Sequence, residues 1–255
     1  MQKYFAILTL WVLLGSVAAQ SVAAQQVLNF ATMDKFSPFT WKENGQAKGI
    51  DIDIVKEMCQ RMGVECNIKF YPWKRVLAYT EEGKIDGGFG AFKNPTREAF
   101  AYFLEYPVHY STFSIFVKKD HEFPFKKIED LYGKNIGINR GFKLNKEFDE
   151  AASTNKIRVQ EAEDMATNIN KLILSRIEGI AGNYHEALVS LKKMGLSDQV
   201  VSLPHPIMPP KGAYLMISKA ANIPNKMQLI DKMNGTLKAM YDDGTVDQIN
   251  AKYLR

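Results

Sequence analysis

From residue 27 onward, short apolar segments alternate with segments in which apolar residues recur every three or four positions. The short segments, such as 27–32, 85–92 and 179–183, are typical of buried strands. The recurring positions, as in 53–62 and 224–241, are typical of amphipathic helices. Alternating strands and helices predict an α/β fold in which mixed sheets are flanked by helices. The same patterns predict further strands at 67–70, 114–117 and 136–139, and further helices at 73–80, 164–176 and 184–194.

Two long segments interrupt this alternation. Residues 106–117 and 202–217 are mostly extended, and both contain proline, which a helix interior does not tolerate. Two such crossings predict a chain that leaves one lobe, builds a second lobe and returns to the first. The predicted lobes are residues 25–110 together with 210–255, and residues 111–209. A ligand of such a protein is expected in the cleft between the lobes.

The first 24 residues have a pattern of their own. Lys3 is followed by an apolar run over residues 4–15 and then by small residues up to Ala24. This order is typical of a cleaved secretory signal peptide, and the apolar run is too short for a stable membrane anchor. Cleavage after Ala24 is favoured, with 17–19 as an earlier alternative site. No cysteine lies beside the site, so a periplasmic protein without a lipid anchor is predicted; a buried N-terminal helix is the alternative.

Composition narrows the class of protein further. The chain has 255 residues, of which 46% are hydrophobic and 24% charged, so it can bury a sizeable core. The net charge of +5 is not concentrated in a basic run, and nucleic acid is therefore not an expected partner. A mild positive charge can steer an anionic ligand. We expect a monomer whose partner is a small molecule.

The chain contains two cysteines, Cys59 and Cys66. Export would place them in an oxidising compartment, where a disulfide is favoured over two free thiols. The bond would join the end of the helix at 53–62 to the strand at 67–70. No histidine or third cysteine lies nearby, so no metal site is predicted, and no cofactor is expected.

Eight short motifs follow one another through the chain. They are Phe36-Ser37-Pro38-Phe39, Gly49-Ile50-Asp51-Ile52-Asp53, the Cys59 and Cys66 pair, Gly83-Lys84-Ile85-Asp86, Asn94-Pro95-Thr96-Arg97, Leu131-Tyr132-Gly133-Lys134 continuing to Gly141, Arg176-Ile177-Glu178-Gly179 continuing to Asn183, and Asp243-Gly244-Thr245. In this order and spacing they resemble the family 3 extracellular solute-binding proteins, of the polar amino-acid type that includes histidine- and lysine-arginine-ornithine-binding proteins. The resemblance implies a periplasmic binding protein type II fold with two lobes and two hinge crossings.

Arg97 is the strongest candidate for a ligand contact. Asn94 can cap a helix and Pro95 suits its first position, so Arg97 is expected in the first helical turn. An arginine can hold a carboxylate with two parallel hydrogen bonds. The resemblance implies that Arg97 binds the carboxylate of the ligand. The alternative is an exposed arginine that pairs with Glu98 or Glu81.

The resemblance also implies how the remaining cleft is lined. Aromatic walls are expected from Phe36 and Trp73, because flat rings exclude water. The other expected ligand-binding positions are Gly90, Ala91, Phe92, Gly141, Phe142 and Asn183. Arg75 is added to them as a source of positive charge near the cleft, and a solvated surface position is its alternative.

Three positions depart from the pattern of the family's amino-acid binders. Asn183 stands where an aspartate pairs with the ligand ammonium, and Phe142 stands where a serine or threonine donates a hydrogen bond. Met33 stands where an acid recognises basic side chains. The carboxylate site is therefore predicted, whereas an α-amino-acid ligand is left open.

The function implied is capture of a small polar ligand, an amino acid or another carboxylate, for delivery to an inner-membrane ABC permease. One alternative is an enzyme of the cyclohexadienyl dehydratase type, with Glu186 and His185 as acid or base. A helix-start glutamate and a surface histidine explain these two residues more simply, so no enzyme is predicted. The other alternative is a sensory binding protein that acts on a receptor's sensor domain without a transporter.

Overall fold

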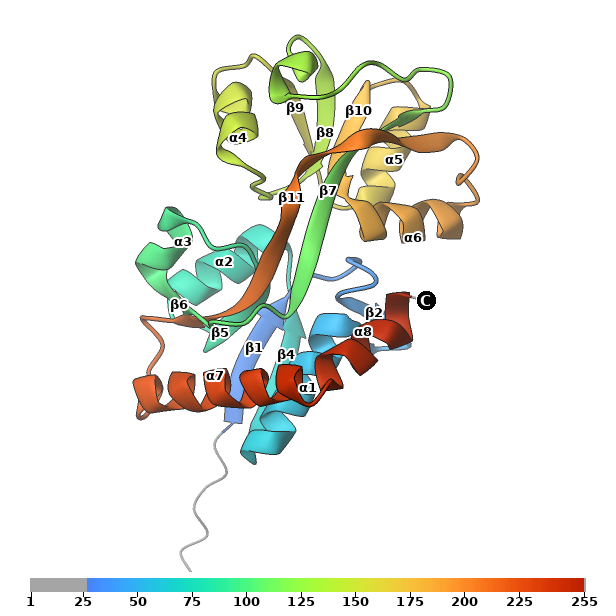
Figure 1. Cartoon of the computed structure of the whole chain (residues 1–255). Coiled ribbons are helices and arrows are strands. Elements are labelled where there is room, and N and C mark those ends of the chain that lie inside the picture. The colour runs from blue at the N-terminus through green and yellow to red at the C-terminus, as the bar shows by residue number, and fades with distance from the viewer. Residues whose placement is uncertain (1–26, 255) are drawn as a thin grey trace, which may run out of the picture.

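Figure 1 shows two lobes joined by two long strands that run side by side between them. The strands are β7 (His109–Lys118) and β11 (Val200–Ser218), which pair antiparallel. This computed structural model describes residues 27–254, so the predicted signal peptide over 1–24 lies outside the described residues. The two-lobe α/β architecture expected from the sequence is confirmed.

The first lobe is built on a sheet with a parallel centre. β1 (Val27–Thr32) lies between β4 (Glu65–Phe70) and β5 (Gly87–Ala91) and is parallel to both. β11 pairs antiparallel with β5 and with the short β6 (Ala101–Phe103). The helices of this lobe are α1 (Ile50–Met62), α2 (Trp73–Glu81), α3 (Pro95–Phe100), α7 (Lys226–Asp242) and α8 (Thr245–Leu254).

Helix α1 begins at Ile50, three residues before its predicted start. The preceding Gly49 has a φ of 128°, and a Cβ there would lie 2.0 Å from the carbonyl oxygen of Phe39. Only glycine permits this approach. The N–H of Asp51 donates to that same oxygen at 3.1 Å. The start of α1 is thereby fixed to the turn that carries Phe36 into the cleft.

Residues 41–48 form a hairpin that the sequence analysis did not predict. β2 (Trp41–Glu43) and β3 (Gln46–Lys48) pair antiparallel around Asn44 and Gly45. Both turn residues have a positive φ, of 50° and 77°. Asn-Gly is the residue pair that two-residue hairpin turns prefer, so the sequence did carry a usable signal here.

In the second lobe, β8 (Asn135–Asn139) is parallel to β9 (Arg158–Ala162) and to β10 (Gly179–Asn183). β10 also pairs antiparallel with β7. Neighbouring residues of β10, Ile180 and Ala181, belong to two different apolar clusters, which therefore lie on opposite faces of the sheet. The helices are α4 (Lys146–Ser153), α5 (Met165–Ile173) and α6 (Tyr184–Met194), with a 3₁₀ turn at Ile128–Leu131.

β11 contributes to the sheets of both lobes. Its pairing with β7 shifts register three times between Ser202 and Lys211, in the stretch that contains its prolines, because proline cannot donate to a strand ladder. The division into residues 25–110 with 210–255 and residues 111–209 stays a prediction. None of the helices within residues 27–254 has the length and apolar character that crossing a bilayer requires.

The predicted disulfide between Cys59 and Cys66 is present and joins α1 to β4. We expect native protein purified under oxidising conditions to contain no titratable thiol. Replacing both cysteines by alanine should lower the free energy of unfolding by about 2 kcal/mol, because the closed loop is short. Urea denaturation of the two proteins would measure this difference. Two reactive thiols in the unreduced native protein would contradict the bond.

Candidate functional site

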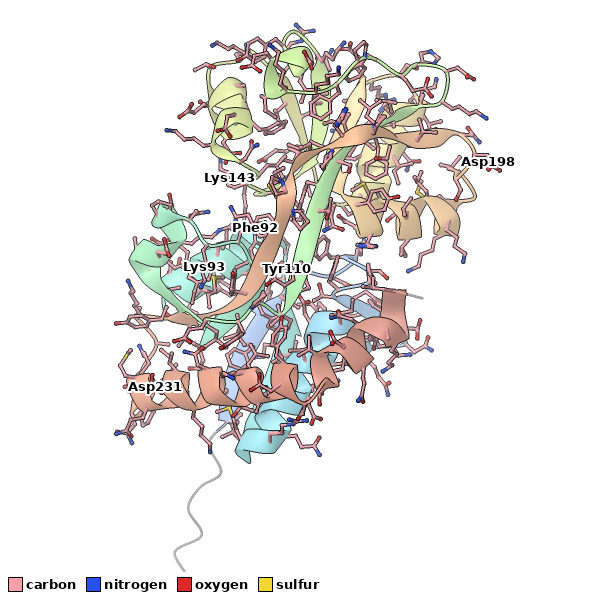
Figure 2. The ribbon with its side chains drawn as sticks, viewed as in Figure 1. Phe92, Lys93, Tyr110, Lys143, Asp198 and Asp231 are labelled. Carbon is pink, nitrogen blue, oxygen red and sulfur yellow. A yellow bond between two sulfur atoms is a disulfide. The ribbon has the colours of Figure 1, made fainter. Side chains whose placement is uncertain are left out.

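A narrow cleft between the lobes brings Arg97 together with five aromatic rings. The rings belong to Phe36, Trp73, Phe92, Phe113 and Phe142, and the remaining lining residues are Met33, Gly90, Ser111 and Lys143. Figure 2 shows Phe92 and Lys143 at the junction of the two lobes. The space left among these side chains is about 30 Å³, whereas ligand pockets typically have about 300–1,000 Å³. A ligand of amino-acid size therefore needs a wider cleft than this arrangement leaves.

Arg97 is held in the cleft by the start of α3. Asn94 caps this helix by accepting the N–H of Arg97 at 2.9 Å, as predicted from the sequence. The side chain of Arg97 is buried, with its guanidinium 5.4 Å from the centre of the Trp73 ring. Nη1 donates to the carbonyl oxygen of Phe92 at 3.0 Å. The alternative of an exposed arginine is therefore wrong.

The guanidinium of Arg97 has no carboxylate within ion-pair distance among residues 27–254. Burial lowers its pKa to about 10, with a small opposing effect from Asp149. The group is therefore still charged at neutral pH. An arginine has five N–H donors, and only Phe92 accepts from its side chain within the described part of the chain. The geometry leaves donors free for an anion.

The aromatic rings span the two lobes. Phe36 of the first lobe packs perpendicular to Phe142 of the second, with ring centres 5.8 Å apart. Phe142 also contacts Phe113 at 6.1 Å, and Phe113 contacts Phe92 at 5.7 Å. Offset and perpendicular rings pack favourably and exclude water. A flat apolar group could replace the contact between Phe36 and Phe142 when the lobes open.

Two ion pairs hold the lobes together beside the cleft. Lys35 Nζ lies 3.0 Å from Asp164, and Lys74 Nζ lies 3.0 Å from Glu161. Each pair joins the first lobe to the second, so the structure represents a closed arrangement. Ion pairs with exposed partners contribute about 0–1 kcal/mol each. These pairs can shift the equilibrium between open and closed forms without fixing the protein in one of them.

A buried hydrogen-bond network crosses the hinge behind the cleft. Asp51 Oδ1 lies 2.7 Å from His109 Nδ1, and His109 Nε2 lies 2.8 Å from Ser111 Oγ. Asn183 Nδ2 donates to the same Ser111 oxygen at 2.9 Å. The ring of His109 stacks on Phe39 at 3.8 Å. The network links α1 of the first lobe, the hinge strand β7 and the end of β10 in the second lobe.

Both polar groups of the Asn183 side chain are used inside the protein. Its Oδ1 accepts the N–H of Glu186 at 3.1 Å and caps α6. Glu186 is fully buried, and its Oε1 accepts from Asn139 Nδ2 at 3.0 Å. Burial raises the pKa of Glu186 to about 8. Asn139 in turn accepts from Asn168 at 3.0 Å, so this network continues into α5.

The structure brings together six of the predicted site residues, namely Phe36, Trp73, Gly90, Phe92, Arg97 and Phe142. Gly141 lies against the Lys74 side chain at the contact between the lobes. Ala91 is buried in β5, and Asn183 is buried behind Ser111. Arg75 is exposed on α2 and lies outside the lining of the cleft. Which of these residues contact the ligand stays a prediction.

Ser111 and Phe113 line the cleft from β7, and the sequence analysis missed both. They are two positions apart on β7, so their side chains lie on the same face of the strand. Following alternate residues along the extended crossing at 106–117 would have identified them. His109 precedes them on the same face and joins them to Asp51.

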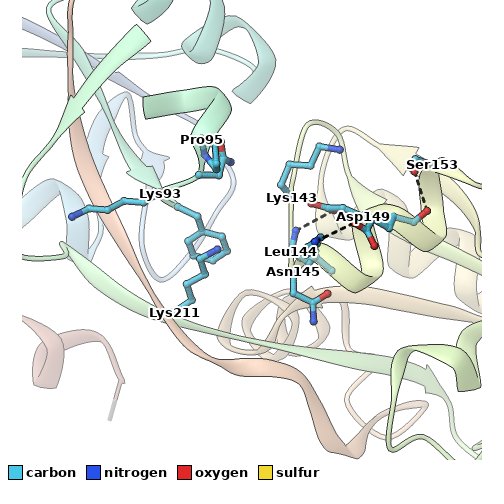
Figure 3. Close-up of a pocket in the computed structure, with 12 residues that line it drawn as sticks. Lys93, Pro95, Lys143, Leu144, Asn145, Asp149, Ser153 and Lys211 are labelled. Carbon is cyan, nitrogen blue, oxygen red and sulfur yellow. Dashed lines mark hydrogen bonds and ion pairs between the residues drawn. The ribbon is translucent and has the colours of Figure 1, made fainter. Parts of the chain in front are cut away.

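A larger cavity of about 540 Å³ opens beside the cleft and shares Phe92 and Lys143 with it. Figure 3 shows Pro95 and Lys211 on one side of this cavity and Lys143 and Asp149 on the other. Burial and the nearby Arg97 lower the pKa of Lys211. Lysines at the entrance to Arg97 raise the local concentration of anions.

A two-lobe fold with an unpaired arginine in an aromatic cleft defines a protein of the periplasmic binding protein class. Residues 28–255 match the model of the bacterial extracellular solute-binding proteins, family 3. The chain belongs to this family. It is 25% identical over 252 residues to ABC transporter arginine-binding protein 1 of Escherichia coli, covering 97% of this chain and 98% of that protein. It is 22% identical over 240 residues to the probable amino-acid-binding protein YxeM of Bacillus subtilis, covering 94% and 88%.

Solved structures with the same fold include amino-acid-binding proteins and a sensor domain. An ancestral arginine-binding protein bound to arginine matches with a TM-score of 0.78 and 24% identity, covering 91% of this chain and 99% of that one. A histidine kinase sensor domain matches with a TM-score of 0.79 and 14% identity, covering 90% and 96%. The ancestral amino acid-binding protein AncCDT-1, a precursor of cyclohexadienyl dehydratase, matches with a TM-score of 0.73 and 24% identity, covering 90% and 95%. At these identities the matches establish the fold alone.

Proposed function

We propose that this protein is a periplasmic solute-binding protein that captures a small carboxylate in the cleft and delivers it to an inner-membrane ABC permease. The observation that carries the proposal is the buried guanidinium of Arg97, which has free donors and no carboxylate partner within residues 27–254. An anion in the closed cleft would neutralise this charge and accept charge-assisted hydrogen bonds from the free N–H groups. The relatives named as arginine- and cystine-binding proteins support a small polar ligand.

The ligand would be captured by closure about β7 and β11. In the open form, Arg97 and the rings of the first lobe are accessible. Closure brings Phe142 against Phe36 and forms the pairs between Lys35 and Asp164 and between Lys74 and Glu161. Hinge closure of this kind buries the ligand and excludes water. The closed form is the one that we expect the permease to recognise.

The geometry favours binding over catalysis. Glu186 is the candidate acid of a dehydratase, but it is buried against Asn139 and does not line the cleft. His185 is half-buried, with its ring 6.4 Å from that of Phe39. Neither residue meets Arg97 in the cleft, as a catalytic pair acting on a carboxylate substrate would need to do. Several relatives are named as parts of ABC transporters, which favours a permease over a sensor domain as the partner.

A thermal-shift screen against amino acids, mono- and dicarboxylates and small amines tests the proposal. A ligand at a hundredfold excess over its Kd should add about 2.7 kcal/mol to the free energy of unfolding. Small-angle scattering with the same ligand should then show a smaller radius of gyration. A screen in which no carboxylate stabilises the protein, or a radius that stays unchanged at saturation, would contradict a closing carboxylate-binding cleft.

A further inference from the structure

The cleft offers positive charge and no negative charge. Of its lining residues, Arg97 and Lys143 are cations, and none is an aspartate or glutamate. An α-amino acid held by Arg97 through its carboxylate would place its ammonium group beside the same carboxylate. In a closed cleft this ammonium would be desolvated next to two cations. A buried charge without a partner is strongly disfavoured.

Two acids near the cleft, Asp51 and Glu186, are fully buried and lie outside its lining. Asp51 Oδ1 pairs with His109, whereas Oδ2 has no hydrogen-bond partner among the described residues and lies 3.3 Å from where a Cβ on Gly90 would be. Burial raises the pKa of Asp51 despite the opposing effect of His109. Glu186 is bonded to Asn139 and is kept protonated by burial up to a pKa of about 8. Neither acid presents a carboxylate to the cleft.

The acids of the neighbouring cavities lie beyond its walls. Asp164 pairs with Lys35 and caps α5 by accepting from Thr167 at 2.9 Å. Asp149 lines the larger cavity, within electrostatic range of Arg97, and burial raises its pKa. Neither Asp149 nor Asp164 is among the residues that line the cleft.

The polar end of the cleft is built from neutral groups that are hydrogen-bonded to one another. Ser111 is bonded to His109 and to Asn183, and Asn183 also caps α6. An ammonium that took the Asn183 oxygen as its acceptor would remove the cap from Glu186 N–H. The five rings leave only apolar surface for the rest of the ligand.

From this arrangement we infer that the ligand is a carboxylate with an apolar, flat body and no ammonium group on the carbon next to the carboxylate. The inference rests on the proposed function and narrows its ligand class. The carboxylate is the one charged group of such a ligand, and Arg97 recognises it. The aromatic rings contact the apolar body of the ligand. A 2-unsubstituted arylalkanoate has this chemistry.

Calorimetry on the full mature protein with matched pairs of ligands tests the inference. The pairs are 3-phenylpropionate and phenylalanine, 4-methylpentanoate and leucine, and 5-guanidinopentanoate and arginine, each differing only in the α-ammonium group. We expect 3-phenylpropionate to bind at least tenfold more tightly than phenylalanine, with the same order in any other pair that binds. An α-amino acid that binds as tightly as its counterpart, or more tightly, overturns the inference and leaves the proposed function standing.

No binding by any of the six compounds also overturns the inference. The proposed function would fail only if the wider screen gave no stabilising carboxylate either, so the two failures are distinguishable.

Asn183→Asp provides a second test on the same ligands. An aspartate can still cap α6, but it places a negative charge one hydrogen bond behind Ser111. We expect at least tenfold weaker binding of 3-phenylpropionate and a gain for phenylalanine. Asn155→Asp makes the same charge change at an exposed turn of the second lobe and should leave both affinities unchanged. A folded Asn183→Asp protein with the wild-type preference between 3-phenylpropionate and phenylalanine would count against the inference. If this variant does not fold, the three ligand pairs measured on the wild-type protein decide it.

Discussion

Arg97→Ala is expected to weaken binding of a carboxylate ligand by about 2–3 kcal/mol, or roughly 30- to 150-fold in Kd. The guanidinium is buried in the cleft and has no carboxylate within ion-pair distance among residues 27–254. Removing it would leave the ligand carboxylate in the closed cleft without the paired guanidinium donors, and Lys143 would be the remaining cation of the lining. Calorimetry with the tightest carboxylate from the screen would measure the loss.

Arg75→Ala is the matched control, because Arg75 is an exposed arginine on the neighbouring helix α2 and does not line the cleft. This variant removes the same charge and should bind with nearly wild-type affinity. Arg97→Lys keeps a charge but loses the planar pair of donors, so an intermediate affinity is expected. Arg97→Ala protein that binds at wild-type affinity would show that the site lies elsewhere.

The loss in Arg97→Ala should come from the site and not from unfolding. Arg97 makes one side-chain hydrogen bond, to Phe92, and its burial without a counter-ion costs free energy in the unliganded protein. The free energy of unfolding without ligand should therefore stay close to that of the wild type. A large loss of stability would instead mean that the guanidinium holds the first lobe together.

The sequence predicted the fold where local pattern and tertiary structure agree. The strand at Val27–Thr32 and the helix at Tyr184–Met194 have strong apolar periodicity and appear with the predicted bounds. β9 and α4 were missed. β9 is the edge strand of its sheet, and of α4 only Phe148 and Ala151 are buried, so neither carries a strong apolar pattern.

The sequence predicted those residues of the candidate site that local rules place, and it missed those that only tertiary packing brings together. Arg97 was predictable because Asn94 and Pro95 define a helix start by local rules, and the structure contains the predicted cap. The network of Asp51 and His109 was not predictable, since its members are 58 residues apart and meet only after the lobes have formed. Burial of Glu186 likewise depends on packing that no local pattern specifies.

Glu186 is expected to make the stability of the protein depend on pH. Its pKa is about 8 in the folded protein against 4.5 for an unperturbed glutamate, and burial is the main cause, opposed by the bond from Asn139. Between these two values the folded protein holds a proton that the unfolded chain has released. The free energy of unfolding therefore falls as pH rises through this window. The loss should be on the order of 5 kcal/mol, since each pKa unit corresponds to about 1.4 kcal/mol.

Glu186→Gln should remove most of this dependence. Glutamine keeps an oxygen that can accept from Asn139 Nδ2, and it has no proton to release. Urea denaturation at pH 5, 7 and 9 should show the variant more stable than the wild type at pH 9 and similar to it at pH 5. Glu147→Gln, at an exposed glutamate of α4, is the control and should follow the wild type at each pH. The prediction is wrong if the stabilities of the wild-type and Glu186→Gln proteins change in parallel from pH 5 to 9. Glu186 would then be ionised in the folded protein throughout that range. The buried carboxylate would need a cationic partner, which the geometry around Asn139 does not provide.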